Sequence, residues 1–348
     1  MIREFARLYC AAALAALCLP ASHLLGQTQV PAAPAQTQAP AAQAQPGQSS
    51  AHPMQIPPAA PEPSGPPVFP KPDPANFTAA SPTKDTVDAF LETNWGYDPN
   101  RVWQVQAILK TQVPNVSKVI VFVGDKTGKE KPAALEFFVL PDGSHIVTGD
   151  QIVSFGAHPY ADTRALMQQK AAGPYRGVAS KDLELVEFAD FQCPHCKEAQ
   201  ANMDKLVADY PKAHIVFEND PIPSIHPESM LAAEYGVCVD QMGGSTAFFQ
   251  YAAAVFDGQD GLSTPDGATL TLNSAVTKAG LDPAKVSACA ALPATKAEVE
   301  ASRALASEIG VNEVPTLVIN GRTIPANIPY DLLKKIIDFQ AKRDGVTP

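Results

Sequence analysis

Apolar residues at helical spacing open the folded part of the chain. Val87, Phe90 and Leu91 repeat at intervals of three to four residues, which is typical of an amphipathic helix. Ser81 precedes them as a candidate N-cap and is followed by a proline at the first helical position, while Gly96 supplies a stop signal. The pattern therefore predicts a helix that begins just after Ser81 and ends near Gly96.

Strand patterns follow this helix. Apolar and polar residues alternate as in half-buried strands, and a Pro-Asp-Gly turn at 141–143 joins two of the runs as a hairpin. The predicted strands cover residues 119–123, 135–139, 145–147 and 151–155, and a connecting helix covers 160–170. These elements predict a small α+β module over residues 81–175.

A different order of elements begins near residue 180. A strand, a helix and a second strand are followed by a long helical block, a hairpin and a closing amphipathic helix. The strands are expected at 183–188 and 215–217, the hairpin at 317–324, and the helices at 196–210, 226–309 and 330–343. This order predicts an α/β domain over residues 180–348, in which residues 226–309 form a helical insertion. Glycines at 243–244 and 258–261 and a proline at 293 are expected to break the helical block.

Composition sets these folded segments apart from the preceding chain. Fourteen of the 34 prolines lie between Pro31 and Pro74, and residues 27–80 are rich in Pro, Ala and Gln. Such a segment cannot bury enough apolar surface to offset the entropy of ordering, so we predict a disordered linker there. The formal net charge of −10 disfavours a phosphate-binding surface, and we expect no nucleic acid among the partners.

The N-terminus has the pattern of a secretory signal peptide. Arg3 and Arg7 precede an apolar run from Leu8 to Leu19. This run is shorter than the roughly 20 residues that a membrane-spanning helix needs. We expect residues 1–26 to be the signal peptide and the mature protein to be periplasmic or secreted, where disulfides persist.

Candidate redox chemistry centres on Cys193-Pro194-His195-Cys196, where a predicted strand meets a predicted helix. The N-terminus of a helix carries partial positive charge and free N–H groups, so a Cys193 thiolate is stabilised there. Cys196, one helical turn later, is the expected resolving thiol, and His195 adds charge that favours the thiolate. His145 and His226 are isolated in the sequence, and we expect no catalytic role for either.

Two separated motifs resemble one known family. The segment from Glu187 to Cys196 resembles the active-site strand and turn of DsbA-type thiol:disulfide oxidoreductases, which belong to the thioredoxin-like superfamily. The segment 310–316 resembles the cis-proline loop of the same family. The resemblance implies a thioredoxin-like fold with a helical insertion, a redox-active Cys193–Cys196 disulfide and no cofactor.

The resemblance also implies roles for other residues. Val314-Pro315 is implied to be a cis peptide facing the cysteine pair, where it shapes the substrate groove. Glu187 matches the buried acid that moves the proton of the resolving thiol. By the same resemblance, Cys238 and Cys289 are expected to form a structural disulfide.

The module over residues 81–175 has no counterpart in simple DsbA oxidases. Its element order resembles the N-terminal dimerisation domain of DsbC- and DsbG-type isomerases, and this resemblance implies a homodimer formed through the N-terminal module. The sequence thus favours donation of disulfides to reduced or misoxidised exported proteins, with reoxidation by a quinone-linked membrane oxidoreductase. A dimeric isomerase or reductase, and a non-catalytic thioredoxin-like binding module, remain as alternatives.

Overall fold

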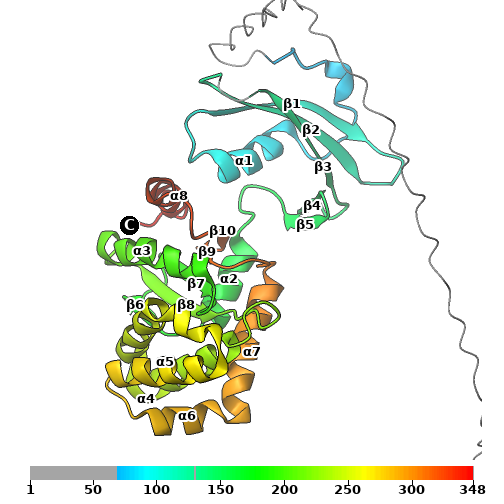
Figure 1. Ribbon diagram of the computed structural model, residues 1–348. Helices are drawn as coiled ribbons and strands as arrows, with labels where there is room; N and C mark the ends of the chain where they lie inside the picture. The colour runs from blue at the N-terminus through cyan, green and yellow to red at the C-terminus, as the bar shows by residue number, and fades with distance from the viewer. Residues whose placement is uncertain (1–68, 129–130, 348) are drawn as a thin grey trace, which may run out of the picture. The chain divides into compact units, whose positions relative to one another are not determined.

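The computed structural model describes residues 69–128 and 131–347 (Figure 1). By internal contacts the chain divides into residues 1–59 and 60–348, and the described residues all belong to the second unit. The expected signal peptide and most of the expected Pro-rich linker lie outside the described residues. Within these residues, no helix combines the length and the apolar character needed to cross a membrane.

The first sheet is antiparallel throughout and follows the order β1-β2-β3-β4-β5. Helix α1 (Lys84–Trp95) packs on one face of it, where Val87 and Leu91 meet the buried positions of β1 and β2. The strands are β1 (Arg101–Lys110), β2 (Ser117–Asp125), β3 (Ala133–Val139), β4 (His145–Thr148) and β5 (Gln151–Ser154). This sheet and helix confirm the α+β character predicted for the segment.

Three details differ from the prediction. Thr83, not Ser81, caps α1 through a hydrogen bond from the Thr86 amide, and Pro82 lies before the helix. Strand β1 was not predicted, because its polar residues interrupt the alternation and a β-bulge shifts its register. Ordered structure also begins before Ser81, since the 3₁₀ helix η1 (Pro74–Asn76) precedes it and Phe77 bridges to β1.

The second sheet has the order β10-β9-β7-β8-β6 (Figure 1). Strands β7 and β8 are parallel, and the other neighbours are antiparallel. The bounds are β6 (Tyr175–Gly177), β7 (Glu184–Ala189), β8 (His214–Asn219), β9 (Thr316–Ile319) and β10 (Arg322–Pro325). Strands β7 and β8 are buried along their whole length, which is typical of parallel strands covered by helices on both faces.

Helices cover the two faces of this sheet. Helices α3 (Pro194–Asp209) and α8 (Tyr330–Arg343) pack on one face, around Leu185 and Ile215. Helix α2 (Ala161–Lys170) packs on the other face, with Met167 against Val186 and Leu305. The predicted connecting helix therefore shares the core of the second sheet.

The helical insertion follows β8, as predicted. It comprises α4 (Ser229–Asp257), η2 (Gln259–Ser263), α5 (Pro265–Lys278), α6 (Pro283–Ala290) and α7 (Pro293–Glu308). Gly244 adopts a positive φ of 71° and interrupts the helical backbone within α4, which fits the glycine break expected there. The insertion packs on the strand ends around Phe191 and Phe217, beside the cysteine pair.

Candidate active site

The cysteine pair lies at the N-terminus of α3. Strand β7 ends at Ala189, and the chain then turns so that Cys193 is the N-cap residue and Pro194 stands in the first turn. A proline is tolerated there because the first N–H groups of a helix have no intrahelical acceptor. Both cysteines are free thiols, Cys193 with 6% of its surface exposed and Cys196 with none. Only the first sulfur is therefore within reach of a partner.

The two thiols have opposite electrostatic environments. A hydrogen bond from the Cys196 thiol, N–H groups of Cys196 and His195, and the electrostatic effect of His226 lower the pKa of Cys193 from 9.0 to about 6, against the effect of burial. Burial, the hydrogen bond to Cys193 and the nearby Glu187 carboxylate raise the pKa of Cys196 far above 9.0. At neutral pH this arrangement favours a thiolate on Cys193 and a thiol on Cys196.

The imidazole of His195, which was expected to add charge beside Cys193, is exposed and lies 3.2 Å from the Glu198 carboxylate. The backbone N–H of His195 is one of the groups that lower the pKa of Cys193. The imidazole whose charge reaches Cys193 belongs to His226. Sequence reasoning missed His226 because it lies 33 positions after Cys193 in a loop without periodicity.

A buried carboxylate holds His226 in place. The Oδ2 atom of Asp190 lies 2.8 Å from Nδ1 of His226 and also accepts a hydrogen bond from the amide of Ile222. The other oxygen of Asp190 accepts from the amide of Gln192, in the turn before the cysteines. Asp190 is 1% exposed, so one fixed side chain positions both the imidazole and the active-site turn.

The loop from α7 to β9 faces the reactive sulfur. The Val314-Pro315 peptide bond is cis, as the resemblance implied. The Cys193 thiol lies 3.8 Å from the carbonyl oxygen of Val314. Pro315 is buried immediately before β9, and Val314 packs on the core cluster that contains both site cysteines.

Glu187 lies beneath the pair on β7. Its side chain is 1% exposed and accepts a hydrogen bond of 2.8 Å from Gln200 of α3. Burial raises the pKa of Glu187 from 4.5 to about 7, although the positive charge of Arg176 opposes the rise. A carboxyl group with such a pKa can hold or release a proton near neutral pH.

Two glutamines attach the active-site turn to the insertion. Gln259 of η2 donates to the carbonyl oxygens of Phe191 and Cys193, at 2.8 and 3.0 Å. Gln192 donates to the carbonyl of Leu262 at 2.9 Å and accepts from the amide of Glu228 at 2.8 Å. Sequence reasoning did not single out these glutamines, since an isolated amide side chain carries no motif.

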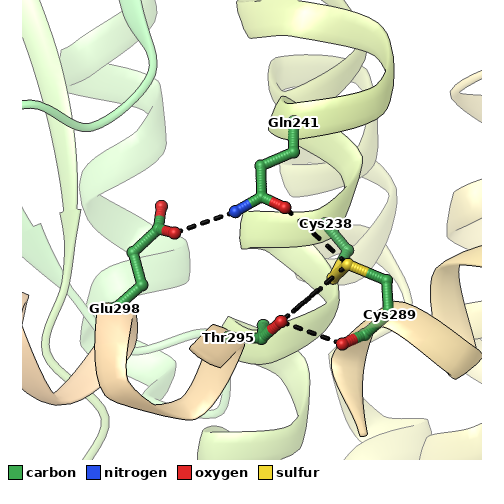
Figure 2. Close-up of a disulfide and its surroundings, with 5 residues drawn as sticks. All are labelled: Cys238, Gln241, Cys289, Thr295 and Glu298. Atoms are coloured by element: carbon green, nitrogen blue, oxygen red, sulfur yellow. Dashed lines mark hydrogen bonds between the residues drawn. A yellow bond between two sulfur atoms is a disulfide. The ribbon is translucent and has the colours of Figure 1, made fainter. Parts of the chain in front are cut away.

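A second pair of cysteines cross-links the insertion. A disulfide joins Cys238 of α4 to Cys289 of α6, with the Cα atoms 6.0 Å apart (Figure 2). The hydroxyl of Thr295, in the first turn of α7, donates to the carbonyl oxygen of Cys289 at 2.8 Å. The bond and this contact hold three helices of the insertion together.

No metal site accompanies the cysteines. In residues 69–128 and 131–347, no group of three or more His, Cys, Asp or Glu side chains has an arrangement that could hold a metal ion.

Comparisons with known proteins give matches over parts of the chain. Residues 170–339 match the family model described as thioredoxin. Among curated proteins, the chain is similar to Na(+)/H(+) antiporter NhaA 3 of Salinispora tropica, at 31% identity over 91 residues, which cover 26% of this chain and 14% of that protein. It is also similar to NhaA 1 of Mycolicibacterium vanbaalenii, at 28% over 171 residues, or 48% of this chain and 26% of that protein. The chain thus spans only 14% and 26% of the length of these two relatives.

Solved structures are similar over about half of the chain. The catalytic domain of Proteus mirabilis ScsC is 21% identical, with a TM-score of 0.44, over 52% of this chain and 96% of that one. The thiol-disulfide exchange protein α-DsbA2 of Wolbachia pipientis is 22% identical, also with a TM-score of 0.44, over 51% and 95%. The family match, the strand order and the helices inserted after β8 together show that residues 170–339 have a thioredoxin-like fold.

Proposed function

We propose that the protein is a thiol:disulfide oxidoreductase that donates the Cys193–Cys196 disulfide to other proteins. One observation carries the proposal: the more accessible sulfur of the pair, that of Cys193, has the lower pKa, and the fully buried sulfur of Cys196 has the higher one. In such a pair the accessible sulfur is both the point of attack and the better leaving group.

The first step is attack on the oxidised pair. A substrate thiolate attacks Sγ of Cys193, a mixed disulfide forms and the Cys193–Cys196 bond breaks. The electron pair passes to Cys196, whose sulfur takes a proton because its buried environment disfavours the anion. Glu187, with a pKa of about 7, is the proposed source of that proton.

The second step releases the product. A second thiolate of the substrate attacks the substrate sulfur of the mixed disulfide, and Cys193 leaves as a thiolate. The substrate gains a disulfide, the enzyme keeps two electrons as a thiolate and a thiol, and the substrate's second proton passes to solvent. The Val314 carbonyl and Pro315 shape the surface on which an extended substrate segment lies beside Cys193 during both steps.

The acidity of Cys193 sets the direction of exchange. With a pKa of about 6 in place of 9.0, Cys193 is mainly a thiolate at pH 7, which stabilises the reduced pair by about 1.4 kcal/mol at that pH. At 30 mV per ~1.4 kcal/mol, this raises the potential by about 30 mV, which favours donation of the disulfide.

A redox titration tests the proposal. We expect the Cys193–Cys196 pair to equilibrate near −120 to −200 mV, on the scale of about −120 mV for strong donors. The protein should oxidise a reduced unfolded substrate stoichiometrically, and Cys193→Ser should abolish that reaction while His195→Ala should keep it. A potential below about −300 mV, typical of structural disulfides, would refute the proposal and favour a non-catalytic binding module.

The location and partners belong to the same proposal. We place the protein in the periplasm or outside the cell, with exported proteins as substrates and a quinone-linked membrane oxidoreductase as the recycling partner. The N-terminal sequence pattern and the cross-linked insertion support an oxidising compartment. Fractionation of cells that express the full chain, with the oxidation state of Cys193 measured in each fraction, tests this location.

A second candidate function rests on the first sheet. A five-stranded antiparallel module precedes the thioredoxin-like domain, and pairing of two chains through it would present two cysteine pairs to one misoxidised substrate. If the protein is an isomerase, we expect it to sediment as a dimer and to restore activity to scrambled ribonuclease. A monomer that oxidises but does not reshuffle would exclude it.

A further inference from the structure

Gln200 of α3 links the buried acid to the resolving cysteine. Its side-chain amide nitrogen donates to Oε1 of Glu187 at 2.8 Å and to the carbonyl oxygen of Cys196, one helical turn earlier, at 3.3 Å. An amide group has two N–H bonds, so it can serve both acceptors at once. Among the described residues, no other side chain donates a hydrogen bond to the Glu187 carboxyl group.

The surroundings of Glu187 make this contact important. Its register partners on the neighbouring strands are the apolar residues Phe217 of β8 and Leu317 of β9. A carboxylate is unfavourable in such surroundings unless it accepts hydrogen bonds or lies near a positive charge. Gln200 supplies such a hydrogen bond from a half-buried position on α3.

Charged and titratable groups reach Glu187 from two elements. Arg176 of β6 pairs with Asp204 of α3, with Nη1 3.0 Å from Oδ1, and the Cys196 thiol belongs to the first turn of α3. Burial raises the pKa of Glu187 to about 7, whereas the charge of Arg176 and the hydrogen bond from Gln200 lower it and the charge of Asp204 raises it. Gln200 is therefore the uncharged group among those that favour the carboxylate.

We propose that Gln200 is a positioning residue for proton transfer, which holds the Glu187 carboxyl group beside the turn of Cys196 and stabilises the carboxylate that the transfer leaves. When the Cys193–Cys196 bond breaks, the electron pair stays on the Cys196 sulfur and the proton moves from Glu187 to that sulfur. Glu187 is left with a negative charge and later regains a proton from solvent. The inference rests on the proposed function, because it assigns Gln200 a part in the same reaction.

A titration of Glu187 tests the contact without any turnover. Carbon-13 NMR of the reduced full-length protein follows the Glu187 carboxyl carbon with pH, and Glu187→Gln identifies its signal. Gln200→Met keeps the length of the side chain but removes the donor, so the pKa of Glu187 should rise above about 7. Gln200→Glu brings a second carboxylate to the same place and should raise that pKa further. An unchanged pKa in both variants would overturn the proposal.

Asn202 provides a matched control on the same helix. Its side-chain amide also donates to two acceptors, the carbonyl oxygens of Ala326 and Ile328, at 3.3 and 2.9 Å. Asn202→Leu therefore removes two hydrogen bonds of α3 that do not involve Glu187. We expect this variant to lose stability and to leave the pKa of Glu187 unchanged. A rise in that pKa as large as the rise in Gln200→Met would mean that any loosening of α3 has the same effect, which contradicts a specific role for Gln200.

A double-mutant cycle tests the proton transfer itself. Oxidised protein is mixed with reduced glutathione, and rapid quenching followed by mass analysis measures formation of the mixed disulfide at Cys193. Gln200→Met should slow this step about fivefold at pH 7, the factor typical of one lost hydrogen bond, and Asn202→Leu should not slow it. In a Glu187→Gln background, Gln200→Met should have no further effect, because Gln200 acts through Glu187. Equal slowing in both backgrounds would overturn the proposal.

The pH profile of the same step separates this inference from the proposed function. The rate per glutathione thiolate should fall as Glu187 loses its proton near pH 7, and Gln200→Met should move that fall to higher pH while Asn202→Leu leaves it in place. If wild-type protein forms no mixed disulfide, the proposed function fails, and the titration still decides whether Gln200 stabilises the Glu187 carboxylate. If wild type reacts and Gln200→Met has the wild-type profile, the proposed function stands and the role of Gln200 is refuted.

Discussion

Two cysteine pairs lie against one core cluster of this molecule, yet their surroundings differ in every respect that matters for reactivity. Cys193 and Cys196 are three positions apart at a helix N-terminus, where N–H groups and a histidine stabilise an anion. Cys238 and Cys289 are 51 positions apart and join the middle of α4 to the end of α6, where the hydroxyl of Thr295 lies 3.7 and 3.9 Å from the two sulfurs. The comparison teaches that position relative to a helix end, rather than burial, separates a reactive sulfur from a cross-link.

Removal of the insertion disulfide is expected to have the largest effect on stability. The double variant Cys238→Ala/Cys289→Ala should lower the free energy of unfolding by up to about 4 kcal/mol, because the bond closes a long loop in the unfolded chain. Urea unfolding of wild type and variant measures the loss. The pKa of Cys193 should stay near 6, and a shift of that pKa together with the stability would show that the two pairs are coupled.

Glu187→Gln is expected to act through pH. The folded-state pKa of about 7 exceeds the ordinary 4.5, so the folded protein binds more protons between these values and its stability falls as pH rises through them. The variant lacks this loss, so its free energy of unfolding should exceed that of wild type by up to about 3 kcal/mol at pH 8, with little difference at pH 4; urea unfolding at the two pH values measures both.

The same variant tests the proton transfer. Formation of the mixed disulfide from the oxidised pair, the step in which Cys196 leaves and takes a proton, should slow about tenfold, a modest loss for a positioned acid–base group. Stopped-flow measurement of that step checks it. A variant with unchanged kinetics but the expected stability gain would assign Glu187 a purely electrostatic role.

Gln259→Leu tests the attachment of the active-site turn to the insertion. The substitution leaves the buried carbonyls of Phe191 and Cys193 without their donor, which should cost about 2 kcal/mol of stability. Gln241→Leu, at an exposed amide of α4, is the matched control and should cost less than about 0.5 kcal/mol. Equal losses in thermal unfolding would show that Gln259 does not hold the turn.

Substitution of the two histidines is expected to have the smallest effect, a change in the pKa of Cys193. His226→Gln should raise the pKa of Cys193 only slightly, since the charge of His226 is the weakest of the influences that lower it. His195→Gln should leave that pKa unchanged, because residue 195 contributes only its backbone N–H. Alkylation of Cys193 as a function of pH measures both effects. A larger change in the Cys193 pKa for His195→Gln than for His226→Gln would show that the side chain of His195 stabilises the thiolate.

The sequence predicted the architecture well where periodicity and local motifs are strong. The Val87–Leu91 spacing located α1, and the Cys193–Cys196 motif located the strand-to-helix junction within one or two residues. Strand β1 escaped prediction because its apolar residues change face at a bulge. Such a change erases the two-residue period on which strand prediction depends.

The electrostatic surroundings of the site were less predictable. His226 and Asp190 are 36 positions apart and meet only because the loop after β8 folds back over the turn that follows β7. Gln259 reaches the turn from the insertion, 66 positions after Cys193. Contacts of this kind depend on tertiary packing, so the local spacing of residues in the sequence does not predict them.

The attachment by glutamines has a consequence for how the protein works through its cycle. Cys193 and Glu187 change their charge as electrons and protons come and go, whereas the amide groups of Gln192 and Gln259 stay neutral at every physiological acidity. The hydrogen bonds from these two glutamines hold the backbone around Cys193, and neither oxidation of the cysteines nor a change of protonation removes them. The conformation of the active-site turn should therefore be the same before the disulfide is donated and after it.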